Sequence, residues 1–306
     1  MRTLLLGAKG QLGLELAKLL PHLQLGEIHT KSRAELDLLD LKALDECLRS
    51  LNPQIVINAS AYTDVDQAQT HADDAYIINH QVPGHLALYA KASHSVLVHY
   101  STDFVFDGKK CSPYIETDKT NPLSVYGLSK CLGEESIRSS GCQHLIFRTG
   151  WLMGVEGQNF MKTILRLAKV KSELKVVCDQ MGAPTSAKWL ANTSMMAMKI
   201  CISKTENHAS VPWGLYHASS KGETSWHAYA KEVISYASGL GARLNLKPHD
   251  VLPIPSGAYP LPAKRPVYSV LSHEKLKNTF GVEPPNWIDA VHEVLDEMTT
   301  FGILGT

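Results

Sequence analysis

Residues 1–13 read MRTLLLGAKGQLG, and this stretch decides the fold class. Arg2–Leu6 is a short apolar run typical of a buried strand, and a helical pattern with a leucine stripe starts at Leu12. Between them lies GxxGxxG, whose glycines allow a tight turn and let a pyrophosphate approach the positive end of the helix. We therefore predict a dinucleotide site, with an ordinary glycine-rich turn as the alternative. The cofactor contacts predicted from this motif are Gly7, Gly10, Gln11, Leu12 and Gly13.

Strand-like and helix-like stretches alternate along the first half of the chain. Buried strands are predicted at 54–58, 95–99 and 144–147, and helices around 40–50, 71–92 and 124–139. This alternation predicts an α/β fold, a Rossmann-type doubly wound parallel sheet with a smaller C-terminal α/β substrate domain. We expect residues 1–150 to bind NAD(P) and 151–306 mainly to bind substrate, while a helix near 187–202 is a candidate to pack back on the sheet. The five prolines of 253–266 exclude a helix or an inner strand and suggest a covering loop.

Composition excludes several classes of function. Thirty basic and thirty acidic residues give a formal net charge of zero, without the broad positive field that nonspecific nucleic-acid or acidic-membrane binding needs. No apolar run approaches a membrane span, and the opening runs into the glycine motif instead of a cleavage site. The six cysteines are scattered without a CxxC pair, and the fourteen histidines include no HExxH. We expect a cytoplasmic protein that binds no nucleic acid, membrane or structural metal.

Cofactor preference depends on the end of the second predicted strand. An NAD site usually carries an acid there, whereas this chain has Lys31, Ser32 and Arg33, which suit a 2′-phosphate. The sequence therefore favours NADPH. The alternatives are that the site takes NADH, or that these side chains are simply solvated and bind no cofactor. Further cofactor contacts are predicted at Asp37, Leu38, Ser60, Ala61 and Tyr62.

The catalytic pattern follows further along the chain. Tyr126 and Lys130 form YxxxK, so that both side chains point the same way from one helical turn. A nearby ammonium is expected to lower the pKa of the tyrosine and to hold the nicotinamide ribose. Thr102 follows the predicted strand 95–100, where a hydroxyl can bind a substrate carbonyl oxygen. The three residues predict a carbonyl reductase site.

With these motifs, the chain resembles the extended short-chain dehydrogenase/reductases and, within them, the dTDP-4-dehydrorhamnose reductases. The resemblance is carried by GAKGQLG (7–13), INASAYTDVDQA (57–68), HYSTDFVFDG (99–108), ETDKTNPLSVYGLSK (116–130), FRTGW (147–151), DQMGAPT (179–185) and YPLPAKRPVYSVL (259–271). It implies NAD(P)H-dependent reduction of the C4 keto group of dTDP-4-dehydro-6-deoxy-L-mannose to dTDP-L-rhamnose, the last step of dTDP-rhamnose synthesis. Tyr126 would donate the proton to the C4 oxygen and Thr102 would bind the substrate. The resemblance also places Asp103 and Trp151 against the sugar and Arg265 near the diphosphate.

Departures from the family pattern affect the sugar pocket and a metal site. The family often has serine at Gly150, which leaves the sugar stereochemistry open. Some members form dimers around magnesium held by glutamates. Glu15 fits that pattern, but Lys188 stands where another glutamate is expected, so no metal is assigned and a homodimer stays open.

Three other functions compete with this reading. The first is a reductase of another dTDP-4-keto-6-deoxy sugar. The second is an epimerase or dehydratase, although dehydratases generally carry an acid pair after the strand-end threonine and Phe104 interrupts it here. The third is a non-catalytic NADP-binding regulatory subunit like the β subunit of methionine adenosyltransferase.

Overall fold

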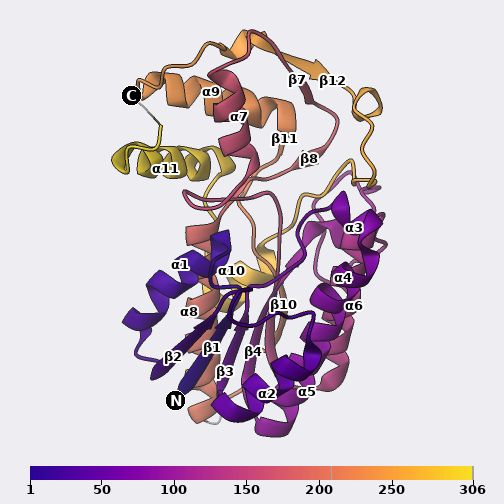
Figure 1. The fold of residues 1–306 in the computed structure, drawn as a ribbon, viewed down its shortest axis with the longest axis vertical. Helices are drawn as coiled ribbons and strands as arrows, with labels where there is room; N and C mark the ends of the chain where they lie inside the picture. Colours follow the sequence, from indigo (N-terminus) through magenta and orange to yellow (C-terminus); the bar gives the residue numbers. More distant parts are fainter. Residues whose placement is uncertain (208, 305–306) are drawn as a thin grey trace.

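The chain folds around a parallel sheet of six strands in the order β10-β5-β4-β3-β1-β2 (Figure 1). The computed structural model describes residues 1–207 and 209–304, so the last two residues of the predicted second domain and residue 208 lie outside the description. The strands of the large sheet are β1 (Arg2–Leu6), β2 (Glu27–Lys31), β3 (Ile55–Asn58), β4 (Val96–Thr102), β5 (Gln143–Thr149) and β10 (Gly214–His217). The order in which strands are added reverses at β1, because β2 pairs in parallel with one side of β1 and β3 with the other. In such a sheet, ligands bind beyond the strand ends at this reversal.

Helices cover both faces of the sheet. One face carries α1 (Gln11–Leu19), α8 (Ala187–Glu206) and α10 (Glu274–Phe280), and the other carries α2 (Leu41–Leu51), α5 (Val82–Ser93) and α6 (Val125–Ser140). Strands β1, β3 and β4 are almost wholly buried, which explains their largely apolar sequences. The doubly wound Rossmann-type fold predicted from the alternation is confirmed.

A smaller part of the molecule lies beyond the strand ends (Figure 1). Its apolar core is formed by α7 (Phe160–Ala168), α9 (Trp226–Gly239) and α11 (Trp287–Thr300). Three two-stranded sheets complete it: β6 (Leu152–Met153) with β9 (Thr185–Ser186), β7 (Leu174–Val177) with β12 (Val251–Ile254), and β8 (Met181–Gly182) with β11 (Thr224–Ser225). Within residues 1–207 and 209–304, no helix has the length and apolar character to cross a membrane.

Two segments after residue 150 return to the large sheet. Helix α8 packs its apolar face on α1, and β10 pairs in parallel with β5 at the edge of the sheet. The proline-rich segment 253–266 contributes Pro253 to β12, which is an edge strand of a small sheet, and then forms a short 3₁₀ turn at Ser256–Ala258. That turn was not predicted, but the segment contains no α-helix and no inner strand.

The predicted helix 71–92 is interrupted. The short helices α3 (Gln67–Thr70) and α4 (Ala72–Tyr76) lead into a π-helical turn, Ile77–Gln81, before α5 starts with Pro83 in its first turn. Periodicity alone does not distinguish a π turn from regular helix, because one extra residue leaves the apolar pattern on both sides intact. The turn buries Asn79, whose polar side chain contacts the site described below.

Gly13 shows why the glycine motif needs its third glycine. A Cβ built at Gly13 would lie 2.0 Å from the backbone oxygen of Gly7, because α1 crosses the strand end at this point. Gly7 itself has φ of 77° and lies against the backbone of Ala59 after β3. The motif is therefore a packing requirement as well as a phosphate cradle.

We predict that Gly13→Ala lowers the free energy of unfolding by at least about 2 kcal/mol, since backbone atoms must move to admit the methyl group. Urea denaturation of purified protein measures the effect. Gly239→Ala in α9 is the matched control, because a Cβ there meets no atom within 4 Å and should change stability by less than about 1 kcal/mol. Equal stability of the two variants would contradict the packing role of Gly13.

Candidate active site

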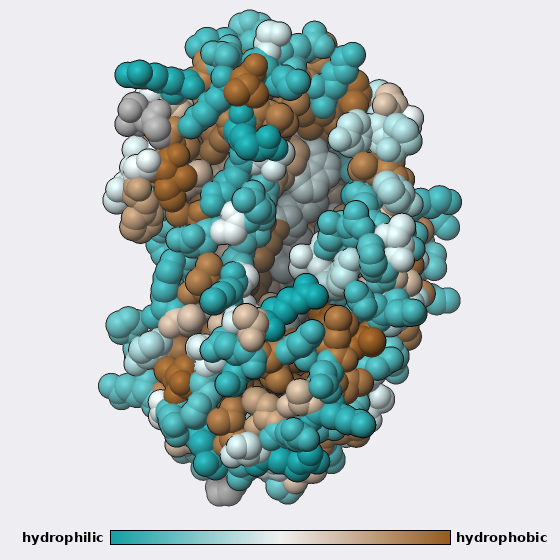
Figure 2. Space-filling view, viewed as in Figure 1, coloured by the Kyte–Doolittle hydropathy of each residue, from teal (hydrophilic) through white to brown (hydrophobic). Residues whose placement is uncertain are grey.

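A cavity of about 780 Å³ opens where the strands of the large sheet end. Figure 2 shows the corresponding hollow between the sheet part and the smaller part. Predicted site residues that line it are Gly7, Gly10, Gln11, Leu12, Lys31, Ser32, Arg33, Asp37, Leu38, Ser60, Ala61, Tyr62, Thr102, Asp103, Tyr126, Lys130, Trp151 and Arg265. Gly13 is not among the lining residues, because it packs beneath Gly7. Residues separated by more than 250 positions thus meet around one volume, and its size is typical of a ligand-binding cleft.

The glycine-rich turn forms the phosphate end of this cavity. Gly10 is the N-cap of α1 and offers no side-chain acceptor to the first amides of the helix. Helix amides of this kind bind anions, because they point outward at the positive end of the helix dipole. The sequence motif and the local geometry therefore agree on a pyrophosphate cradle.

At the end of β2, an acidic side chain joins the predicted basic loop. The Glu35 carboxylate accepts hydrogen bonds from the Ser32 amide at 2.8 Å and from the Ser32 hydroxyl at 2.5 Å. These bonds, aided by Lys31 and Lys9, lower the pKa of Glu35. The spacing Ser-x-x-Glu is a known capping pattern and could have revealed the pair. Since Ser32 already binds Glu35, Lys31 and exposed Arg33 are the groups left to meet a 2′-phosphate.

Helix α6 presents Tyr126 and Lys130 to the cavity from successive turns. The helix starts at Ser124, whose hydroxyl caps the Gly127 amide at 3.2 Å. Lys130 Nζ donates to the Tyr100 carbonyl oxygen at 2.5 Å and lies 3.4 Å from His99 Nε2. Burial lowers the pKa of Lys130 to about 8. The buried His99 has a pKa held well below its usual range, mainly by desolvation, so it adds no charge beside the lysine.

The prediction that Lys130 lowers the pKa of Tyr126 is wrong for this geometry. Desolvation raises the pKa of Tyr126 to about 12, the nearby Thr102 hydroxyl opposes this rise, and the charge of Asp103 adds to it. The Lys130 ammonium does not compensate, because it is directed to the Tyr100 carbonyl and His99. Tyr126 consequently keeps its proton at neutral pH, which suits a proton donor.

Asp103 lies beside Thr102 and is almost fully buried. Its Oδ1 accepts from the Thr102 hydroxyl at 3.1 Å, and its Oδ2 accepts from the Ser269 hydroxyl. Burial raises the pKa of Asp103 to about 6, against the effect of these bonds. A Cβ at Gly150 would lie 2.7 Å from Oδ2, so the Asp103 carboxylate can occupy this position only because residue 150 has no side chain. Ser269 was not predicted, since a contact across 166 positions leaves no local pattern.

Two tryptophans form a wall of the cavity. Trp151 has a left-handed backbone, with φ of 46°, and stacks on Trp226 at a centroid distance of 3.5 Å. Its ring covers Gly182, where a Cβ would lie 2.6 Å from the indole. Flat apolar rings of this kind can pack against a sugar or base. Trp226 was not predicted, and it enters the site as the first residue of α9.

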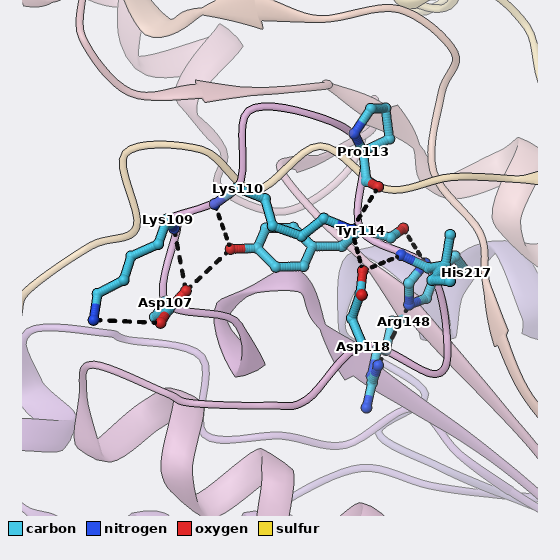
Figure 3. Close-up of polar contacts among 9 residues, drawn as sticks. Asp107, Lys109, Lys110, Pro113, Tyr114, Asp118, Arg148 and His217 are labelled. Atoms are coloured by element: carbon cyan, nitrogen blue, oxygen red, sulfur yellow. Dashed lines mark hydrogen bonds and ion pairs between the residues drawn. The ribbon is translucent and has the colours of Figure 1, made fainter.

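A buried ion pair fixes the helix that carries Tyr126. Arg148 of β5 donates to both oxygens of Glu134 in α6, at 2.9 and 2.6 Å, and both side chains are at most 2% exposed. The guanidinium also lies 5.0 Å from the centre of the Phe106 ring, which stacks on Tyr114. Figure 3 shows Tyr114 held between Asp107, whose Oδ1 accepts from the phenol at 3.1 Å, and His217 of β10. Helix α6 is thereby tied to the sheet and to the segment after β4.

The π turn ties the loop after β3 to the same helix. Asn79 Oδ1 accepts from the Tyr62 amide at 2.9 Å, while Nδ2 donates to the Tyr62 carbonyl and to the Ser129 hydroxyl, both at 3.1 Å. Ser129 precedes Lys130 in α6. The predicted cofactor residue Tyr62 is therefore positioned relative to the YxxxK motif by one buried amide.

The residues weighed for a metal site are engaged in ion pairs. Glu15 accepts from Lys18 at 2.9 Å, and Lys188 pairs with Glu293 and Glu297 on α11. Across the described parts of the chain, no group of three or more His, Cys, Asp or Glu side chains is arranged to hold a metal ion.

Asp103 generates a pH prediction with a definite sign. Its pKa of about 6 in the folded protein exceeds the usual 3.8, so the folded state binds this proton more tightly than the unfolded state does. The stability that protonation of Asp103 contributes is therefore present at low pH and is lost as the pH rises through about 6. Between pH 4 and 7, wild type should therefore lose more unfolding free energy than Asp103→Asn. Urea denaturation at constant ionic strength measures both slopes, with Asp73→Asn at an exposed position of α4 as control. Parallel profiles for wild type and Asp103→Asn would refute the assignment.

The family model described as the RmlD substrate binding domain matches residues 1–300. A dTDP-4-dehydrorhamnose reductase from Burkholderia thailandensis is 43% identical over 95% of this chain and 97% of its own length. The Escherichia coli K12 protein of the same name is 38% identical over 98% and 99%.

Solved structures give the same result. A dTDP-4-dehydrorhamnose reductase from Clostridium acetobutylicum superposes with a TM-score of 0.85 at 35% identity, covering 98% of this chain and all of that one. The Bacillus anthracis enzyme, solved in complex with NADP, has a TM-score of 0.83 at 32% identity, covering 97% and 99%. The chain belongs to the dTDP-4-dehydrorhamnose reductase family.

Proposed function

We propose that this protein reduces the C4 keto group of dTDP-4-dehydro-6-deoxy-L-mannose with NAD(P)H and forms dTDP-L-rhamnose. The observation that carries the proposal is that Tyr126 and Thr102 line one cavity between a glycine-rich pyrophosphate cradle and a wall of tryptophan. The names of the full-length relatives support the same reaction.

The mechanism divides between cofactor and protein. When bound, NAD(P)H would supply the hydride for C4 of the sugar. Tyr126 gives its phenolic proton to the C4 oxygen as charge develops there, and its high pKa keeps that proton available over the physiological range. Thr102 lies next to it and can hydrogen-bond the same oxygen. Lys130, whose ammonium donates to the Tyr100 carbonyl, would hold the nicotinamide ribose.

Residues of the cavity fit a dinucleotide along the large sheet and a sugar nucleotide against the smaller part. The glycine cradle, Lys31 and Arg33 would hold the phosphates of NADPH, and Trp151 and Asp103 would contact the sugar. Residues 1–150 would mainly serve the cofactor and residues 151–306 mainly the substrate, with α8 and β10 returning to the sheet. We place the enzyme in the cytoplasm. Its oligomeric state, monomer or homodimer, is a matter for measurement in solution.

The direct experiment follows nicotinamide absorbance when purified protein meets NADPH and the keto sugar, which upstream dehydratase and epimerase supply, with product identified by NMR. Formation of dTDP-L-rhamnose is expected. Turnover only with a different dTDP-4-keto-6-deoxy sugar would correct the substrate. NADPH binding without turnover of any keto sugar would instead favour the regulatory subunit.

Within this assay, we predict that Tyr126→Phe lowers kcat by about 10²- to 10⁴-fold, because only the donated proton is removed. NADPH affinity, measured by fluorescence titration, should stay within about twofold of wild type. Near-normal turnover of the variant would remove Tyr126 from the role of proton donor.

Arg33→Ala should weaken NADPH binding about tenfold and leave NADH binding nearly unchanged, because only NADPH carries the 2′-phosphate that a guanidinium would bind. Isothermal titration with each cofactor measures both constants. Equal losses for the two cofactors would show that Arg33 does not select between them.

A further inference from the structure

A strap of residues 255–265 crosses beside the cavity from β12 toward α3 (Figure 1). At its start, the Ser256 amide and hydroxyl donate to the Asp179 carboxylate at 2.9 to 3.0 Å. Just after its end, the Val267 carbonyl accepts from the Met181 amide at 2.8 Å. The segment is thus fixed to the smaller part of the molecule before and after the strap, while Ala263 and Arg265 near the end of the strap reach the sheet part.

In the described residues, the hydrogen bonds between the strap and the first 150 residues all converge on one side chain. Asp66 Oδ1 accepts from the Ala263 amide at 3.1 Å and from Arg265 Nη1 at 3.2 Å, and Oδ2 accepts from Arg265 Nη2 at 2.7 Å. The carboxylate therefore binds the guanidinium in a bidentate geometry, the strongest arrangement for such a pair. Asp66 stands at the N-cap of α3, yet its side chain caps no amide of that helix.

Arg265 carries the cationic charge available to a diphosphate on the substrate side of the cavity. Lys9, Lys31 and Arg33 line the dinucleotide end, and Lys130 is buried against Tyr100. Of the five N–H groups of Arg265, two donate to Asp66 and one to the Ala263 carbonyl at 2.9 Å. Two N–H groups remain for a ligand on the guanidinium edge that Asp66 does not hold.

We propose that Asp66 is a positioning residue for sugar-nucleotide binding, which holds Arg265 and the strap so that the free N–H groups of Arg265 bind the diphosphate. The inference rests on the proposed function, since it takes a nucleoside diphosphate as the ligand. Asp66 itself would not contact the substrate, because its oxygens are occupied by the strap.

Electrostatics and positioning predict opposite effects when the charge of Asp66 is removed. A carboxylate near a diphosphate repels it, so a purely electrostatic role means that Asp66→Asn tightens binding. If Asp66 positions Arg265, the same change weakens binding, because a carboxamide presents one oxygen and one NH₂ group and cannot accept both Arg265 bonds. The direction of the change therefore separates the two roles.

The test is isothermal titration of dTDP and of thymidine into the purified full-length protein. We expect Asp66→Asn to weaken dTDP binding by about tenfold, the scale of a lost charge-assisted hydrogen bond, and to leave thymidine binding unchanged. Arg265→Lys should weaken dTDP similarly, and the double variant should lose little more than either single one. In turnover, KM for the sugar nucleotide should rise while kcat stays within about twofold.

Asp64→Asn is the matched control. It removes the same charge two positions away, where among the described residues the carboxylate accepts only from the Gln67 amide, a bond that asparagine can keep. Unchanged NADPH binding and thermal midpoint would show that each variant is folded. Tighter or equal dTDP binding by Asp66→Asn, or an equal loss for thymidine, would overturn the inference. Failure of wild type to bind dTDP would instead overturn the proposed function, and the inference with it.

Discussion

The ion pair between Arg148 and Glu134 is the interaction on which the catalytic geometry depends. Replacing such a pair with apolar groups can be neutral, but removing one partner leaves an unpaired buried charge and costs about 3–5 kcal/mol. Here the pair joins β5 to α6 one turn beyond Lys130, and the guanidinium is also packed against Phe106 after β4. Tyr126 is therefore held relative to Thr102 by a contact between two residues that do not line the cavity.

Burial acts on the three ionisable groups of the site in a common direction. It raises the pKa of Tyr126 and Asp103 and lowers that of Lys130, so each is shifted toward its uncharged form. At neutral pH Asp103 stays mostly ionised and Lys130 mostly protonated, whereas Tyr126 stays neutral, so a carbonyl that gains negative charge during reduction would meet a surface formed by the hydroxyls of Tyr126 and Thr102. The fixed dipoles of such a surface stabilise developing charge without having to reorganise.

The sheet and the cavity could be predicted from the sequence because both depend on local patterns. Apolar runs mark β1, β3 and β4, and the glycine motif and YxxxK mark the two turns that face the cavity. Contacts between distant segments could not be predicted: Asp103 with Ser269, or Asp66 with Arg265 across 199 positions. The error on the pKa of Tyr126 has the same origin, since spacing puts Lys130 on the correct helical face but does not show that its ammonium turns to the Tyr100 carbonyl.

The π-helical turn at Ile77–Gln81 also constrains how this segment can change in length. Each residue of a helix advances the direction of its side chains by about 100°, so loss of one residue would restore regular hydrogen bonding yet rotate everything on one side of the turn. Asn79 would then face away from Tyr62 and Ser129, or α5 would turn its apolar side away from the sheet. Natural variation in the segment should consequently favour substitution over deletion, even where the deletion would give a more regular helix.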